Sequence, residues 1–200
     1  VPVLEEVRAP TMFRIANRNA PHNLYADTEL VREYIDARGY LFNQNVEPLY
    51  RFGNDQTNWS DDAGRVTIKY SEFTTVIWKQ DGEQYSRFIV DGYSPTNDAE
   101  AHNFITRDGY TDILNTSTIV IIQGPLYNDE ATTLPSVLTV GVGPLTIISN
   151  GKYIQGTWRR NDIADPFEFY DNDTNKIQVP PSKQWIHLLP IDGSVNISEK

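Results

Sequence analysis

The chain has 200 residues, 39% of them hydrophobic and none of them cysteine, and its formal net charge is −10 at pH 7. This length suits one large domain or one domain with an appendage, and it suffices to bury a core without disulfide bonds. The acidic balance argues against a nucleic-acid partner, and the absence of cysteine excludes disulfides, thiolate metal sites and cysteine nucleophiles.

The amino-terminal part predicts a single helix, from about Thr28 to Arg38. Asp27 and Thr28 offer side-chain oxygens for an N-cap, and Gly39 is a residue type that commonly ends a helix. Four apolar residues recur at helical spacing: Leu30, Val31, Tyr34 and Ile35. The helix is therefore expected to be amphipathic.

From about residue 64 onward the apolar period changes to two, which is typical of β-strands. Residues 66–70 alternate in this way. Residues 75–79 and 85–90 are expected to form a hairpin around the turn signal Asp81-Gly82. Residues 91–109 contain few apolar positions and predict a loop with at most one helical turn.

The continuous apolar run at residues 117–123 predicts a strand that is buried on both faces. Residues 126–134 are polar and predict no regular structure, whereas residues 137–142 predict another strand. No window approaches eighteen apolar residues, so the sequence predicts no membrane span.

Residues 145–149 and 152–158 are expected to form another hairpin, because Asn150-Gly151 suits a type I′ turn. Further strands are expected at 167–170, 176–179 and 185–189, and residues 191–200 are expected to fray. The predicted fold class is α+β, predominantly antiparallel β built from hairpins, with one amino-terminal amphipathic helix.

A cluster of basic and polar residues near the amino terminus is the leading candidate for a ligand site. Arginines and a histidine at close spacing can grip a carboxylate or phosphate through charge-assisted hydrogen bonds. The alternative is that the arginines pair with acids of a neighbouring domain and that the asparagine satisfies a turn. The cluster comprises Arg14, Arg18, His22, Asn23 and Tyr25, and Arg87 and His102 are expected to join it.

Other chemistry has weaker support in the sequence. The three histidines show no metal-ligand spacing, and His187 alternates with apolar strand residues, which predicts a packed or edge histidine. Asp171, Asp173 and Asn175 have the opening spacing of a calcium loop, but an Asx-type turn is favoured because the later ligands are missing. No nucleotide-binding or nucleophile motif occurs, so no cofactor, metal or catalytic residue is predicted.

Four Asn-x-Ser/Thr sequons are candidate glycosylation sites if the protein is secreted by a glycosylating cell, although chance accounts for such sequons in a chain rich in Asn, Ser and Thr. They begin at Asn58, Asn115, Asn172 and Asn196.

Several blocks of the chain resemble the YerB-like family of bacterial cell-surface lipoproteins (DUF3048 type), whose biochemical role is poorly defined. The strongest are GKYIQGTWRR (151–160), FYDNDTNKI (169–177) and QWIHLLP (184–190), which resemble the family's carboxy-terminal domain. PHNLY (21–25) resembles the segment that closes its amino-terminal domain. One departure is Ala101-His102-Asn103, where the family often has Asp after the histidine.

The resemblance implies three parts: a remnant of the amino-terminal domain (1–45), a β-rich carboxy-terminal domain (46–190) and a tail (191–200). It implies an extracytoplasmic binding or interaction protein at a bacterial surface, without catalytic activity. The expected partners are cell-wall components, another surface protein and the missing amino-terminal part of the same protein. Two alternatives stay open: a cell-wall polymer hydrolase using His22 or His102 with a loop carboxylate, and a structural module that assembles through β edges.

Overall fold

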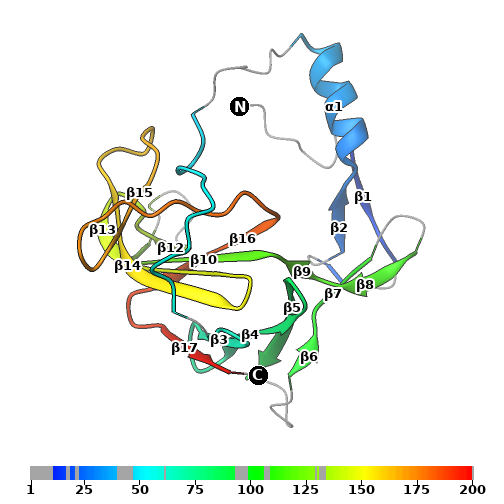
Figure 1. Ribbon diagram of the computed structural model, residues 1–200. Helices are drawn as coiled ribbons and strands as arrows, with labels where there is room; N and C mark the ends of the chain where they lie inside the picture. Colours follow the sequence, from blue (N-terminus) through cyan, green and yellow to red (C-terminus); the bar gives the residue numbers. More distant parts are fainter. Residues whose placement is uncertain are drawn as a thin grey trace. The chain divides into compact units, whose positions relative to one another are not determined.

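The computed structural model describes residues 11–16, 19–20, 23–39, 47–60, 62–92, 99–105, 109–128, 130 and 134–199 (Figure 1). The chain divides into two compact units, Val1–Val46 and Glu47–Lys200. Each unit is described by itself below.

The first unit contains a two-stranded hairpin and one helix. Strands β1 (Met12–Arg14) and β2 (Leu24–Ala26) pair antiparallel, and helix α1 spans Thr28–Ala37. Asp27 is the N-cap, since its carboxylate accepts hydrogen bonds from the backbone N–H groups of Glu29 (3.1 Å) and Leu30 (3.3 Å). No residue of α1 is buried.

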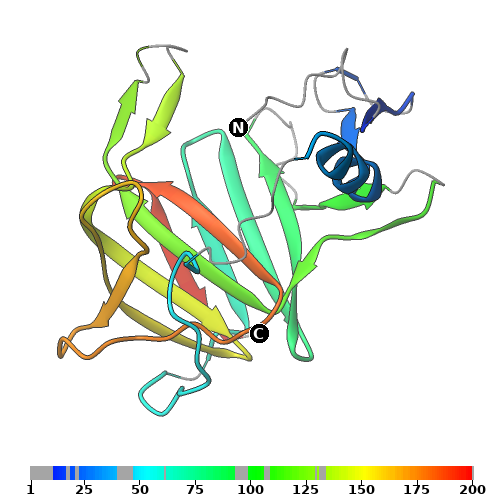
Figure 2. The ribbon, with the colours of Figure 1, turned by 90° about the horizontal axis from the view of Figure 1, so that it is seen from above.

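The second unit is built around two β-sheets that Figure 2 shows from above. The strand order of the first sheet is β15 (Glu168–Asp171), β14 (Lys152–Arg160), β13 (Gly141–Ser149), β10 (Thr118–Gly124) and β16 (Gln184–Pro190). The β10–β16 pair is parallel, whereas the other pairs in this sheet are antiparallel.

The second sheet is antiparallel and has the order β17 (Ser194–Ser198), β3 (Arg65–Lys69), β4 (Thr74–Asp81), β5 (Gln84–Asp91) and β6 (Glu100–Ala101), and β9 (Asn115–Thr116) also pairs with β5. Two small hairpins complete the unit: β7 (Asn103–Ile105) with β8 (Thr111–Ile113), and β11 (Leu126–Asn128) with β12 (Pro135–Val137). In the described part of the chain no helix has the length and apolar character needed to span a membrane.

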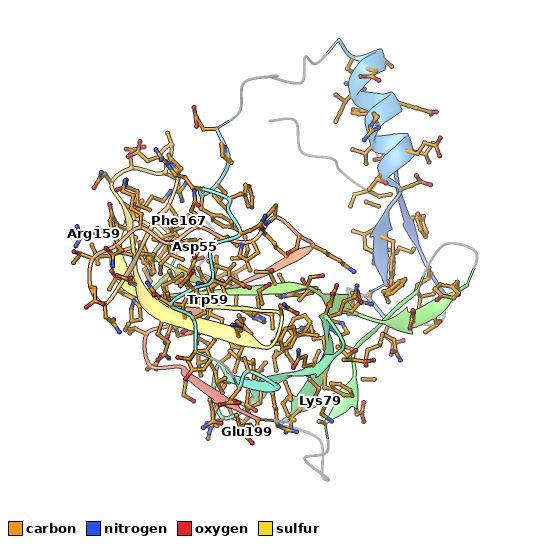
Figure 3. The ribbon with its side chains drawn as sticks, in the orientation of Figure 1. Asp55, Trp59, Lys79, Arg159, Phe167 and Glu199 are labelled. Atoms are coloured by element: carbon orange, nitrogen blue, oxygen red, sulfur yellow. The ribbon has the colours of Figure 1, made fainter. Side chains whose placement is uncertain are left out.

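Strand β10 contributes to two hydrophobic clusters because its side chains alternate between the faces of the sheet. Ile119 and Ile121 pack with residues of β3, β4, β5, β13 and β16. Val120 and Ile122 pack on the opposite face, in a cluster that Trp59 and Phe167 of the connecting segments help to close (Figure 3). This arrangement confirms the prediction of a strand buried on both faces.

The predicted hairpins at the two strongest turn signals are present. Asn150 (φ 53°) and Gly151 (φ 75°) connect β13 to β14, as the prediction of a type I′ turn requires. Gly82 (φ 61°) lies in the turn between β4 and β5. The chain is mostly antiparallel β with one short helix among the described residues, which confirms the coarse fold class.

Several segments differ from the sequence prediction. The expected loop at 91–109 contains β6 and β7, and the unstructured region expected at 126–134 begins with β11. These strands have two or three residues each and little burial, so they leave no apolar alternation in the sequence. They form because a neighbouring strand supplies the backbone partners.

Three more expectations are wrong. The strand expected at 137–142 is divided between the end of β12 and the start of β13. Residues 176–179 make only isolated bridges, from Lys176 to Tyr170 and from Val179 to Phe52. The tail expected to fray instead contains β17, which pairs with β3 over five residues and packs Val195 and Ile197 against the core.

Candidate functional site

Two of the predicted site residues of the first unit, Arg14 and Asn23, contact each other across the β1–β2 hairpin. The Arg14 guanidinium donates a hydrogen bond to Oδ1 of Asn23 (2.6 Å), and Nδ2 of Asn23 donates to the carbonyl of Ile15 (3.2 Å). The ring of Tyr25 stacks on Phe13 with 5.9 Å between centroids. Arg18 and His22 lie outside the described residues. Asn23 thus satisfies local polar groups, as the alternative interpretation anticipated.

Arg87 and His102 lie side by side in the second unit. The backbone N–H of His102 donates to the carbonyl of Arg87 (2.9 Å), which continues the β5–β6 pairing by one residue. The Arg87 guanidinium contacts Nδ1 of the His102 ring. Because a guanidinium can only donate, Nδ1 of His102 is the acceptor and is unprotonated in this contact.

The guanidinium of Arg87 lies against aromatic rings rather than against a carboxylate. Its central carbon is 4.9 Å from the ring centroid of Trp185 and 5.9 Å from that of Trp78. Its Nε atom is buried without a hydrogen-bond acceptor, and no described carboxylate forms an ion pair with it. Burial lowers the pKa of Arg87, an effect that nearby Tyr70 partly offsets. The result is a partly desolvated cation that has no anionic partner among the residues the structure describes.

Beneath Arg87 lies a buried imidazole, His187, which is 2% exposed. The indole N–H of Trp78 donates to its Nε2 (2.8 Å), and Oη of Tyr70 lies 2.6 Å from its Nδ1. Since an indole N–H can only donate, Nε2 is the acceptor, and in the neutral ring Nδ1 carries the proton and donates to Tyr70. Burial, reinforced by the charge of Arg87, lowers the pKa of His187 to about 3.

The structure therefore confirms the prediction of a packed histidine at position 187. The sequence did not reveal its partners, because Tyr70 is 117 positions away and Trp78 is 109 positions away. The only local signal was the alternation of Trp185, His187 and Leu189, which places them on one face of β16. We call Arg87, His102, Trp78, Trp185 and His187 the Arg87 cluster.

The residues with calcium-loop spacing form a turn. Oδ1 of Asp171 accepts hydrogen bonds from the backbone N–H groups of Asp173 (3.0 Å) and Asn175 (2.8 Å), and its Oδ2 accepts one from Nδ2 of Asn175 (3.1 Å). This is the favoured Asx-type arrangement. Among the described residues, no group of three or more His, Cys, Asp and Glu side chains could hold a metal ion.

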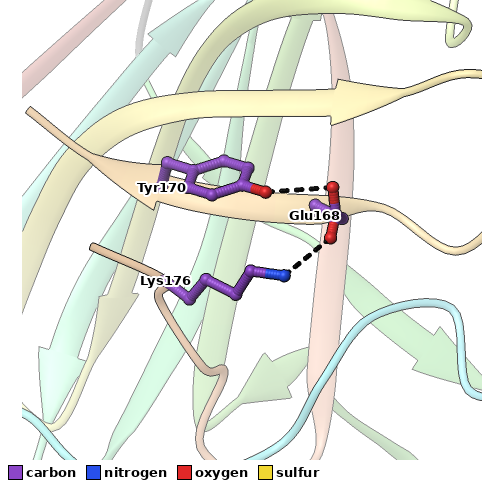
Figure 4. A network of polar contacts seen from close by, with 3 residues as sticks. All are labelled: Glu168, Tyr170 and Lys176. Atoms are coloured by element: carbon purple, nitrogen blue, oxygen red, sulfur yellow. Dashed lines mark hydrogen bonds and ion pairs between the residues drawn. The ribbon is translucent and has the colours of Figure 1, made fainter. Parts of the chain in front are cut away.

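One concave region of the second unit was not predicted from the sequence. A cavity of about 220 Å³ lies between residues 47–51, the region of β15 and residues 176–178. Figure 4 shows the polar network at its rim, where Glu168 accepts hydrogen bonds from Nζ of Lys176 (2.8 Å) and Oη of Tyr170 (3.0 Å). The Lys176 hydrogen bond, followed by that of Tyr170, lowers the pKa of Glu168. Segments that are far apart in the sequence form this cavity, so no local sequence motif predicts it.

The sequence pattern of one family matches most of the second unit. The carboxy-terminal domain of the family described as protein of unknown function DUF3048 matches residues 65–186. The chain belongs to the DUF3048 family. This match confirms the resemblance inferred from the GKYIQGTWRR and QWIHLLP blocks.

The crystal structure of the YerB protein from Bacillus subtilis is similar to this DUF3048 chain, with a TM-score of 0.63 and 16% sequence identity. The match covers 93% of this chain and 59% of the YerB chain, so this chain spans less than two thirds of YerB. At this identity the likeness shows a common fold. No curated protein matches the chain.

The asparagine side chains of the four candidate glycosylation sequons differ in their environment. Asn58 and Asn172 are exposed in turns. Oδ1 of Asn115 accepts a hydrogen bond from Nζ of Lys183 (2.9 Å), and Asn196 lies within β17, paired with Thr67. Asn58, Asn172 and Asn196 are therefore exposed, whereas Asn115 is half-buried.

Proposed function

We propose that this DUF3048 protein is an extracytoplasmic binding module without catalytic activity, which captures a carboxylate- or phosphate-bearing ligand. The observation that carries this proposal is the state of Arg87. Its guanidinium has lost part of its hydration, stacks on Trp185, and has no acid partner among the described residues. A bound anion would compensate that charge through charge-assisted hydrogen bonds.

The binding proposal is favoured over hydrolysis because the described histidines are already engaged. Both ring nitrogens of His187 have partners, and Nδ1 of His102 faces a guanidinium. Asp112 lies in β8, close to His102 in the chain. Its carboxylate accepts hydrogen bonds from the backbone N–H of Ile113 (2.7 Å) and from the hydroxyl of Tyr110 (3.1 Å). A general base needs a free nitrogen or carboxylate oxygen within reach of the substrate.

The placement outside the cytoplasm, at a bacterial surface, rests on the resemblance to YerB-like lipoproteins. The residues proposed for the first unit, Arg14, Arg18, His22, Asn23 and Tyr25, would form a separate anion-binding element. Cell fractionation of the native host would test the placement, and recovery in the cytosol alone would contradict it.

The ligand proposal is tested with Arg87→Ala, Arg87→Lys and the control Arg159→Ala. Arg159 also stacks on an aromatic ring, that of Tyr170 at 4.9 Å, but it is exposed (Figure 3). Inorganic phosphate and succinate serve as probes in calorimetric titrations. We expect the original chain and Arg159→Ala to bind at least one probe, and Arg87→Ala not to bind it. Arg87→Lys should bind it about tenfold more weakly, because the single ammonium group of lysine replaces the paired N–H donors of the guanidinium.

Equal binding by Arg87→Ala and the original chain would overturn the proposal, as would binding of neither probe by the original chain. Near-ultraviolet circular dichroism of each variant separates a lost site from a lost fold. For the hydrolysis alternative, incubation with purified bacterial cell wall and measurement of released reducing ends should give no signal above the buffer control.

A further inference from the structure

Strand β16 is an unprotected edge of the five-stranded sheet. It pairs with β10 on one side, and no described strand pairs with its other side. An edge strand presents unpaired N–H and C=O groups, and proteins usually protect such edges with charges, prolines or short strands. Strand β16 has seven residues, carries no aspartate, glutamate, lysine or arginine, and has its proline at the last position.

The other three sheet edges are protected. Strand β15 has four residues, including Glu168 and Asp171. Strand β6 has two residues, and β17 has five residues with three exposed polar side chains. Strand β16 is thus longer than each of these three edge strands, and unlike β15 and β6 it carries no charged residue.

The solvent-facing side chains of β16 are apolar. Trp185, His187 and Leu189 point into the core, whereas Ile186 is 37% exposed and Leu188 is 44% exposed. Leu126, Leu138 and Ile191 are also exposed beside Gly124 and Pro125, where β10 ends. An exposed apolar strip along an unpaired edge is typical of an interaction surface.

The sequence of β16 is complementary to itself in one antiparallel register. With a two-fold axis at His187, Ile186 lies opposite the partner's Leu188, and Trp185 lies opposite the partner's Leu189. Each exposed apolar side chain then meets another, and no charges of like sign meet within the strand pair. We propose that β16 pairs in this register with β16 of a second copy of the chain, which joins two five-stranded sheets into one.

The absence of cysteine makes this register directly testable by cross-linking. Residues directly opposite in an antiparallel pair have Cα atoms about 4.5–5.5 Å apart, within disulfide reach. Mixing Ile186→Cys with Leu188→Cys chains under mild oxidation should give a disulfide-linked heterodimer in high yield. Either variant alone should give at least about fivefold less, because two copies of the same position are then roughly 8 Å apart.

Analytical ultracentrifugation from about 1 to about 200 µM, which covers the dissociation constants of weak dimers, tests the association itself. We expect a concentration-dependent dimer that strengthens with salt, because screening weakens repulsion between two chains of net charge −10. Ile186→Lys should be monomeric. The control Ile163→Lys, at a 67% exposed isoleucine away from β16, should dimerise like the original chain.

The proposal is overturned if the original chain stays monomeric throughout the concentration range, or if Ile186→Lys dimerises as well as Ile163→Lys. Equal cross-linking by mixed and single cysteine variants would also overturn it, because the register would then be wrong. The cysteine variants remove only part-exposed side chains, so they keep the test valid if the lysine variant fails to fold.

Discussion

His187 is a neutral imidazole held in the core, and this makes stability depend on pH. It faces Tyr70, Trp78, Trp185 and Arg87. Its folded pKa of about 3 is below its usual value of 6.5, so between these pH values the unfolded chain binds a proton that the folded chain does not. The free energy of unfolding should therefore fall as pH decreases from about 6.5 toward 3, by up to about 1.4 kcal/mol per pH unit.

Urea unfolding of the original chain and of His187→Gln at several pH values from 4 to 7 isolates this contribution, because the carboxylates titrate in both proteins. The variant should be less stable near pH 7 and should show a shallower dependence of stability on pH. Parallel pH profiles for the two proteins would contradict the account of His187.

Tyr70 accepts a hydrogen bond from the buried ring of His187, so its hydroxyl should matter to stability. Tyr70→Phe leaves Nδ1–H of His187 without an acceptor and should cost about 1–3 kcal/mol of unfolding free energy. Tyr170→Phe is the matched control, since its hydroxyl bonds Glu168 on the surface, and it should leave stability unchanged. Equal denaturant midpoints for the two variants would refute this role for Tyr70.

Individual site residues were only partly predictable from the sequence. Arg87 and His102 were both predicted as site residues and are in contact, but nothing near them in the chain indicates Trp185, which lies on the other sheet. Aromatic and histidine residues at alternate positions of a strand indicate that one face of the sheet is buried. They do not indicate which residues pack on that face. Their partners come from the packing of two sheets, which a single sequence does not specify.

Gly156 in β14 leaves room for the neighbouring strand, which gives a prediction for the sheet. A Cβ atom at Gly156 would clash with the carbonyl oxygen of Tyr170 in β15. Gly156→Ala should therefore separate β14 from β15 and cost more than about 2 kcal/mol. Gly82→Ala meets no atom within 4 Å but has a φ of 61°, so it should cost only about 1 kcal/mol.

Thermal unfolding of both glycine variants gives the comparison. The expected order of stability is the original chain, then Gly82→Ala, then Gly156→Ala. The reverse order of the two variants would mean that turn conformation matters more than strand spacing.

Strands with strong local signals were predicted, and strands that depend on a distant partner were not. The Asn150-Gly151 turn and the apolar strand β10 can each be predicted from the residues that form them. The hairpin of β11 and β12 has few buried residues and no tight turn signal, and the parallel β10–β16 pairing joins segments that lie far apart in the chain. Such elements gain stability from tertiary pairing, which leaves little periodicity in the sequence.

All residues of the two hydrophobic clusters belong to the second unit, which predicts that this unit folds alone. A chain of residues 47–200 retains both clusters complete. It should keep the near-ultraviolet circular dichroism spectrum of the full chain. Its melting temperature should lie within a few degrees of that of the full chain, which corresponds to a change in unfolding free energy of about 0.5 kcal/mol.

The matched control is residues 61–200, which lacks Tyr50 and Trp59, at 2% and 7% exposure. Loss of these aromatic side chains should cost at least about 3–5 kcal/mol and unfold or strongly destabilise the unit. Equal stability of the two truncated chains would show that residues 47–60 are not part of the core.

The central claim for the whole protein is that its second unit binds an anion at Arg87. Nuclear magnetic resonance titration with inorganic phosphate and succinate tests this claim most directly, by following the Nε–H signal of Arg87 and the indole N–H signals of Trp78 and Trp185. We predict saturable shifts of these three signals with at least one of the two anions, while the indole signal of Trp158 stays constant. Unchanged signals at saturating concentrations of both anions, or shifts spread evenly over all the tryptophans, would contradict the account.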